Sequence, residues 1–199
     1  ETWAWDGSGS WSQLSASAAQ GWRGQFQMTF DADRGRVLIF GGFGSLPGMP
    51  GWPANGGLLS DTWELDPPPA IAPLWRRRCP SAGPPADNSP SMSYDAARDR
   101  LVVVTKGDTL QTWEWNPAGS TESAWELRLA GMSEPPVADD LVLGFDRALR
   151  RTMLVTQAYP GFLQMWNWNG EQWAARPSAV HPSRRVGFAG AFERVVGAE

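Results

Sequence analysis

Apolar and polar positions alternate in the same way in four short stretches of the chain. In each stretch two large apolar residues stand two places apart, separated by Glu, Ala or Asn and followed by Asp or Asn. Alternation with a period of two is typical of a β-strand, and the closing Asp or Asn indicates a turn. The pattern therefore predicts a strand at residues 2–6, 62–66, 112–116 and 165–169.

A further Trp follows each of these stretches at a short distance, as Trp11, Trp75, Trp125 and Trp173. Each unit is therefore predicted to be a hairpin with an aromatic side chain on each arm. In two copies the turn contains Asp6-Gly7 or Asn169-Gly170, and such pairs favour the tight primed turns of hairpins.

A second unit recurs within the chain ahead of three of these hairpins. An aromatic residue and an acid are followed, five places after the acid, by an Arg that opens a continuous apolar run. Such a run is typical of a strand buried on both faces. The acid and Arg pairs recur in every copy, so they are interpreted as surface turn braces worth about 0–1 kcal/mol each rather than as a catalytic site. The pairs are Asp31 with Arg36, Asp95 with Arg100, and Asp146 with Arg151.

Together the two units make a repeat of four antiparallel strands, which is a propeller blade. The first Trp of each motif stands at 3, 63, 113 and 166, so the spacings are 60, 50 and 53 residues. The sequence predicts an all-β fold, a β-propeller of four-stranded antiparallel blades in a single domain over residues 1–199. The repeats span about 23–80, 87–130 and 138–178, and a fourth blade is split between the termini, with 183–199 paired with 1–16.

The chain resembles the kelch-repeat β-propeller family, whose period is ~50 residues, and especially its Trp-rich bacterial variety. Asp61-Thr62-Trp63 and residues 1–7 carry the resemblance, whereas the Gly-Gly that the family has after the second strand survives only as Gly41-Gly42. The resemblance implies the fold and leaves the function open. Kelch rings generally have six or seven blades. A small closed ring, a ring shared with another copy and a piece of a larger propeller therefore all remain open.

Thirteen Trp residues are the outlier in the composition. Because each motif copy is placed on the third strand of a blade and faces its neighbour, the motif Trp residues are interpreted as packing between blades. These eleven structural residues are Trp3, Trp5, Trp11, Trp63, Trp75, Trp113, Trp115, Trp125, Trp166, Trp168 and Trp173.

Composition and charge narrow the possible partners. Apolar residues make up 42% of the chain and charged residues 19%, which suits a folded protein. No apolar run approaches the ~20 residues that span a bilayer, so membrane insertion is not expected. A net charge of −4 argues against nucleic acid as a partner. The one basic cluster, Arg76-Arg77-Arg78, is interpreted as the guard of an exposed edge strand, with a ligand site as the alternative. Cys79 is alone, so the compartment stays open, with a secreted or cell-surface location preferred.

Two Trp residues break the repeat pattern and mark the predicted binding face. Trp22 stands with Arg23 in the joint before the first full blade, and Trp52 stands in a Gly- and Pro-rich insertion at 43–60. Both joints emerge at the same end of the blades, and an exposed aromatic beside Gly and Arg is typical of sugar and peptide grooves. The alternative is that Trp52 caps its own loop and Trp22 packs under the rim.

A basic pocket is a second possibility on the same face. His181, Arg184 and Arg185 lie together in the last joint, and with Arg23 they would suit an acidic ligand, because Arg presents a planar fork to carboxylates. Ordinary solvated loop residues are the alternative interpretation.

No catalytic constellation is found. Copper-radical oxidases resembling galactose oxidase need several His and Tyr ligands, and this chain offers only His181, Tyr94, Tyr159 and Cys79. No metal, no cofactor and no enzymatic activity are therefore expected. The sequence predicts a non-catalytic interaction module that binds a protein segment or a glycan. A self-assembling structural propeller is one alternative, and a glycan-active hydrolase or oxidase with site residues outside this chain is another.

Overall fold

The computed structural model describes residues 1–15, 20–45, 56–66, 74–78, 83–87, 89–119, 125–130, 135–138, 140–157 and 162–177. Within these ranges all regular structure is β, with fifteen strands in four antiparallel sheets. The expectation of an all-β fold is confirmed. No helix long and apolar enough to cross a membrane occurs in the described part of the chain.

Four sheets follow one another along the chain, and we name them A to D. Sheet A has two strands, sheet B has five, and sheets C and D have four each. Sheet A consists of β1 (Thr2–Trp5) and β2 (Trp11–Ser15). Sheet B consists of β3 (Trp22–Gly24), β4 (Gln27–Asp31), β5 (Arg36–Ser45), β6 (Gly57–Leu65) and β7 (Trp75–Arg78). Sheet C consists of β8 (Ser91–Asp95), β9 (Arg100–Lys106), β10 (Leu110–Trp115) and β11 (Glu126–Leu129), and sheet D of β12 (Asp140–Asp146), β13 (Arg151–Gln157), β14 (Leu163–Trp168) and β15 (Trp173–Arg176).

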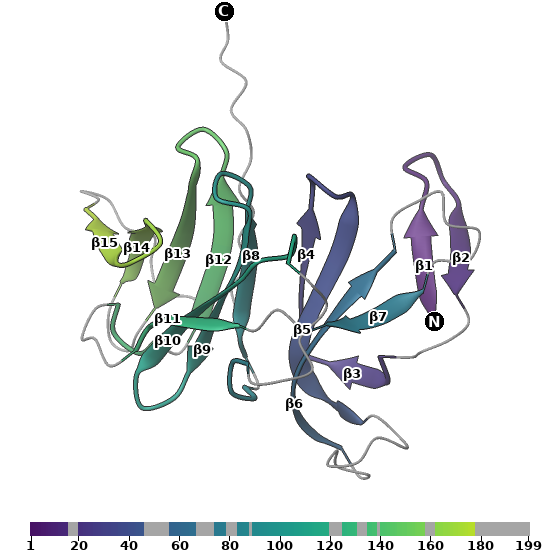
Figure 1. Ribbon diagram of the computed structural model, residues 1–199, viewed down its shortest axis with the longest axis horizontal. Helices are drawn as coiled ribbons and strands as arrows, with labels where there is room; N and C mark the ends of the chain where they lie inside the picture. The colour runs from purple at the N-terminus through teal and green to yellow at the C-terminus, as the bar shows by residue number, and fades with distance from the viewer. Residues whose placement is uncertain are drawn as a thin grey trace, which may run out of the picture.

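The predicted repeat register is confirmed in sheets B, C and D. The acid that ends the first strand pairs with the Arg that opens the second, for example Asp95 with Arg100. The Trp motif forms the third strand, and the second Trp stands at or directly before the fourth. The sheets are arranged like a fan, and their first strands β4, β8 and β12 lie side by side near its middle (Figure 1). This arrangement is propeller-like, and the described residues do not close a ring.

Most of the core lies between successive sheets, and a smaller cluster of Ile39, Trp63 and Trp75 lies within sheet B. The face of each sheet toward the preceding sheet is called its leading face, and the opposite one its trailing face. Between sheets B and C, Leu38 and Phe40 pack against Tyr94, Trp115 and Trp125. A second cluster between sheets C and D joins Val102, Val104 and Leu110 to Leu154, Trp166, Trp168 and Trp173. The interpretation of these Trp residues as packing between sheets is confirmed.

A repeated hydrogen bond ties each sheet to the one before it. The Nε1 of Trp125 donates to the Oγ1 of Thr62 at 3.1 Å, and the Nε1 of Trp173 donates to the Oγ1 of Thr112 at 2.9 Å. Trp75 donates in the same way to Thr2 of sheet A at 2.8 Å. We call this contact the Trp–Thr latch. It gives the indole N–H an acceptor within the interface. Without that acceptor, burying the N–H would cost free energy.

The predicted side-chain braces between the acid and the Arg five places on are wrong. Asp31 and Asp95 are buried, and their Oδ1 atoms accept hydrogen bonds from backbone amides two and three residues further along the turn. Their ion-pair partners are Arg34 and Arg98, each at 3.0 Å. Arg36 contacts Glu64 on β6 instead. The carboxylate of Asp31 already accepts hydrogen bonds within its own turn. The longer side chain of Arg36 therefore extends to Glu64 on the neighbouring strand.

The hairpin turns of the Trp motif are also longer than predicted. Trp5 pairs with Trp11 and Trp168 with Trp173, which leaves loops at 6–10 and 169–172 rather than two-residue turns. In each loop the first side chain acts as acceptor, because Asp6 and Asn169 bind backbone amides with Oδ1.

The basic cluster is divided between two roles. Arg76 lies exposed on β7, an edge strand of sheet B, and pairs with Asp66 at 2.9 Å. Arg78 is buried instead, with its guanidinium carbon 5.2 Å from the ring centre of Trp115 and its Nη1 3.4 Å from the Oε2 of Glu64. The edge-guard interpretation therefore fits Arg76 and is wrong for Arg78.

Sheet A departs from the expected burial of the motif. Trp3, Trp5 and Trp11 are 48%, 49% and 64% exposed, so the prediction that they are packed between blades is wrong for the described part of the structure. The predicted partner of this sheet, residues 183–199, lies outside the described residues.

Candidate functional site

The predicted insertion is largely an extension of sheet B. β5 runs on to Ser45 and β6 starts at Gly57, so both ends of the expected loop at 43–60 are strands. β3 pairs with the extended part of β5. A Cβ atom at Gly44 would lie 2.2 Å from the carbonyl oxygen of Trp22, so only glycine allows this close pairing. Residues 46–55, with the predicted site residue Trp52, lie outside the described part.

Arg23 fixes β3 in place. Its side chain is 3% exposed and binds both carboxylate oxygens of Asp61 at 2.8 Å, while Nη1 also donates to the carbonyl oxygen of Gly41 at 3.1 Å. Asp61 also accepts from the indole of Trp63. The predicted ligand-binding cation is therefore engaged internally and acts as a positioning residue for Trp22. The other members of the expected basic pocket, His181, Arg184 and Arg185, lie outside the described residues.

Trp22 stands at the mouth of a cavity of about 400 Å³ between sheets A and B. Its ring is 59% exposed, and the rings of Trp3 and Phe26 are also accessible. We call this cavity the aromatic cleft. Its principal lining residues are Trp3, Gln20, Trp22, Phe26, Met28 and Trp75.

The aromatic cleft contains few free polar groups. The Nε1 of Trp3 donates to Glu1 at 3.0 Å, and Arg23 is held by Asp61. The Oε1 of Gln20 is shielded from solvent and has no hydrogen-bond partner in the described structure. Because a buried acceptor without a donor costs free energy, a ligand hydroxyl or amide that donates to Gln20 would be favoured. The cleft is thus suited to apolar ring faces and one hydrogen-bond donor.

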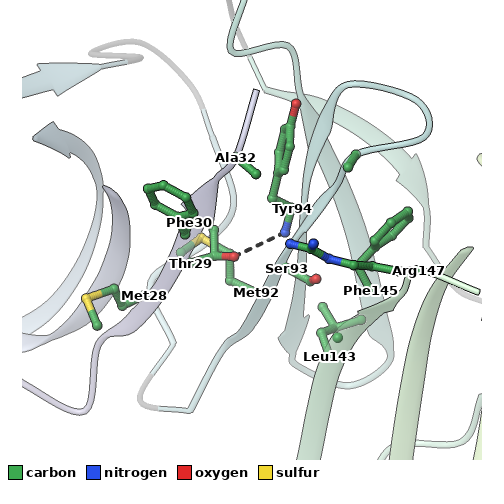
Figure 2. Close-up of a pocket in the computed structure, with 12 residues that line it drawn as sticks. Met28, Thr29, Phe30, Ala32, Met92, Ser93, Tyr94, Leu143, Phe145 and Arg147 are labelled. Carbon is green, nitrogen blue, oxygen red and sulfur yellow. Dashed lines mark hydrogen bonds between the residues drawn. The ribbon is translucent and has the colours of Figure 1, made fainter. Parts of the chain in front are cut away.

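A second cavity of about 320 Å³ lies where the first strands meet, and we call it the axial pocket (Figure 2). Met28 and Phe30 come from β4, Ser93 from β8, and Leu143 and Phe145 from β12. The backbone amide of Tyr94 on β8 donates to the Oγ1 of Thr29 on β4 at 3.3 Å, and this hydrogen bond joins the two strands. Met28 and Phe30 are exposed, whereas Met92 and Tyr94 at the same positions of sheet C are buried. The pocket residues contributed by β4 are therefore more accessible than those contributed by β8.

Arg147 breaks the repeat at this pocket. The residue after the turn acid is Ala32 in sheet B and Ala96 in sheet C but Arg147 in sheet D, and all three line the pocket. Figure 2 shows the guanidinium reaching across toward β8. No hydrogen bond or ion pair joins it to another described residue. Arg147 was missed by the sequence reasoning, although comparing the residues after the three aligned acids would have identified it.

A polar cluster at the turn end of the same strands is internally satisfied. The hydroxyl of Tyr94 lies 2.6 Å from Asp33 and 2.9 Å from Asp99, and Arg34 binds both oxygens of Asp99 at 2.6 and 2.7 Å. Burial, followed by the hydrogen bonds to Asp33 and Asp99, raises the pKa of Tyr94 above its ordinary value. The Arg34 guanidinium holds the pKa of Asp99 below its usual range. These groups link sheet B to sheet C, and none is left unpaired for chemistry.

Models of known protein families give no match to this chain, and a search of curated proteins gives none either. Within the described ranges no group of three or more His, Cys, Asp or Glu side chains is arranged to hold a metal ion.

Proposed function

We propose that this chain is a non-catalytic binding module on kelch-like propeller blades, and that its aromatic cleft binds an uncharged glycan. Three repeated meanders with adjacent first strands, joined by the Trp–Thr latch, support the kelch-like assignment.

The observation that carries the ligand class is the exposed ring of Trp22 beside the unpartnered Oε1 of Gln20. The C–H faces of a sugar ring stack on flat aromatic surfaces, and its hydroxyls supply the donor that Gln20 lacks. The charged side chains of the cleft already have partners, so an ionic ligand gains little there. β3 is held by the Arg23–Asp61 ion pair, so the Trp22 ring does not have to be ordered on binding.

The test is a glycan array followed by calorimetry on the glycans retained. Trp22→Ala is expected to weaken binding about tenfold or more, since aromatic anchors commonly contribute over ~1.4 kcal/mol. Trp11→Ala is the matched control, because Trp11 is similarly exposed and lies outside the cleft. Retained glycan binding by Trp22→Ala would contradict the proposal. Capture of a protein segment that the same variant loses would keep the cleft and reject the glycan.

A second ligand class is favoured by Arg147 in the axial pocket. A guanidinium with no described partner, in a pocket that Phe145 also lines, suits a carboxylate that carries an apolar group. Aromatic carboxylates are the probes, measured by chemical-shift titration at low and high salt. Arg147→Ala is expected to abolish the response, whereas Arg76→Ala, at an exposed position on β7, leaves it unchanged. A response that survives in Arg147→Ala excludes this site.

A further inference from the structure

Each internal interface joins acceptors on a trailing face to Trp donors on a leading face. Thr112 and Glu114 on β10 accept from Trp173 and Trp168 at 2.9 and 2.6 Å. Thr62 on β6 accepts from Trp125 in the preceding interface. The two faces therefore form a repeated, directional contact.

Sheet A carries the donor half of this contact, and no described residue packs in front of it as sheet C packs in front of sheet D. Trp5 and Trp11 occupy the positions of Trp168 and Trp173, and their ring centroids are 5.4 Å apart, against 5.0 Å in sheet D. Both rings of sheet A are about half exposed or more. Neither indole N–H has an acceptor in the described structure. Among the described residues, the leading face of sheet A is thus a donor surface without acceptors.

Sheet D carries the other half at the opposite end of the fan (Figure 1). Met165 and Asn167 stand on β14 where Thr112 and Glu114 stand on β10. The Oδ1 of Asn167 is shielded from solvent and has no partner in the described residues, and Asn167 lines a cavity of about 330 Å³ with Arg151 and, from sheet C, Asp95 and Arg98. An acceptor at the position of Glu114 therefore receives no hydrogen bond from the described part of the chain.

We propose that two copies of this chain associate head to tail, with Trp5 and Trp11 of one copy docked on the trailing face of sheet D of the other. The indole of Trp5 then donates to Asn167, as Trp168 does to Glu114 within the chain. The thioether of Met165 is only a weak acceptor for the second bond, so the contact is weaker than the internal interfaces and reversible. A second copy is the occupant because sheets A and D, the two outer sheets of the fan, carry the two halves of a contact that the chain already uses internally.

The first test is sedimentation velocity of the 199-residue chain over a range of concentrations. The wild-type chain is expected to associate as its concentration rises, and the Trp5→Ala/Trp11→Ala variant to remain monomeric. These rings are exposed in the single chain, so their removal leaves the fold intact. Trp22→Ala is the control and is expected to associate as wild type does, because Trp22 lies in the aromatic cleft. The same variant tests the two proposals separately. If Trp22→Ala loses glycan binding but still associates, the aromatic cleft and the contact between copies are independent sites.

The second test restores the acceptor pair. Met165→Thr with Asn167→Glu copies the trailing face of sheet C, and Arg151 stands where Arg36 meets Glu64 in sheet B. This variant is expected to lower the dissociation constant about tenfold or more, and adding Trp5→Ala/Trp11→Ala is expected to cancel the gain. A wild-type chain that stays monomeric, together with no gain in the restored variant, would overturn the proposal.

Disulfide trapping distinguishes contact between copies from closure within one chain. Two variants are made in a Cys79→Ser background, one with Trp11→Cys and the other with Asn167→Cys. A covalent dimer is expected only when the two preparations are mixed. A chain carrying both substitutions that forms only an internal link would refute association between copies.

Discussion

The same Trp pair has two different fates in sheets A and D. Trp168 and Trp173 lie 5.0 Å apart between ring centroids and are 1% and 8% exposed. Trp5 and Trp11 lie 5.4 Å apart in a similar tilted arrangement and are 49% and 64% exposed. The hairpin therefore sets the geometry of the pair, whereas a preceding sheet decides its burial. The Trp pair forms locally within its hairpin, whereas its contribution to stability depends on whether another sheet packs against it.

The largest expected effect contrasts the two pairs directly. Trp168→Ala removes a buried ring from the interface between sheets C and D and leaves a cavity, so the free energy of unfolding is expected to fall by about 3–5 kcal/mol. Trp5→Ala removes an exposed ring and is expected to cost under about 1 kcal/mol. Chemical denaturation of both variants checks the contrast. Equal losses would show that exposure in sheet A does not describe the protein in solution.

The latch gives a contrast of intermediate size. Thr112→Val keeps the shape of the side chain but leaves the indole N–H of Trp173 buried without an acceptor, at a cost of about 1–3 kcal/mol. Thr2→Val makes the same change opposite Trp75, where water reaches the half-buried pair, and is expected to cost less than about 0.5 kcal/mol. The measurement is again the unfolding free energy. A neutral Thr112→Val would mean that the latch contributes nothing.

Alkaline pH tests the junction between sheets B and C. The pKa of Tyr94 is raised, so its contribution is fully present below the unfolded value of about 10 and is lost as the pH rises toward the folded value. Stability of the wild-type chain is therefore expected to decline above about pH 10, and Tyr94→Phe to decline less steeply. Unfolding curves measured at several alkaline pH values check this. Parallel declines in both proteins would contradict the assignment.

The smallest effect is expected at the hairpin loop of sheet A. Hydrogen bonds from the backbone amides of Ser8 and Ser10 lead the causes that lower the pKa of Asp6 to about 2. Its folded pKa is depressed, so the loop loses this contribution only as the pH falls toward 2, below the unfolded value. NMR titration of the Asp6 carboxyl is the measurement. A midpoint near 4 would show that the loop is not formed.

The repeat register was predictable because one hydrophobic period and one acid position recur in every copy. Asp95 with Arg100, for example, marks the turn that the structure contains. The side-chain partners were not predictable. Arg36 pairs with Glu64 rather than Asp31 because β6 lies beside β5, and the sequence alone does not show that pairing of side chains. Likewise, the sequence showed Arg23 next to Trp22 but not the carboxylate of Asp61, which is 38 residues away and engages that cation.

One directional contact joins the sheets, and at sheet A the described residues leave it without a partner. The exchange of indole N–H protons tests this most directly. In dilute protein, Trp125 and Trp173 are expected to exchange slowly, because each N–H is buried and bonded to a Thr. Trp5 and Trp11 are expected to exchange fast and to slow as the concentration rises. Equal exchange rates at all four indoles, unaffected by concentration, would contradict the account.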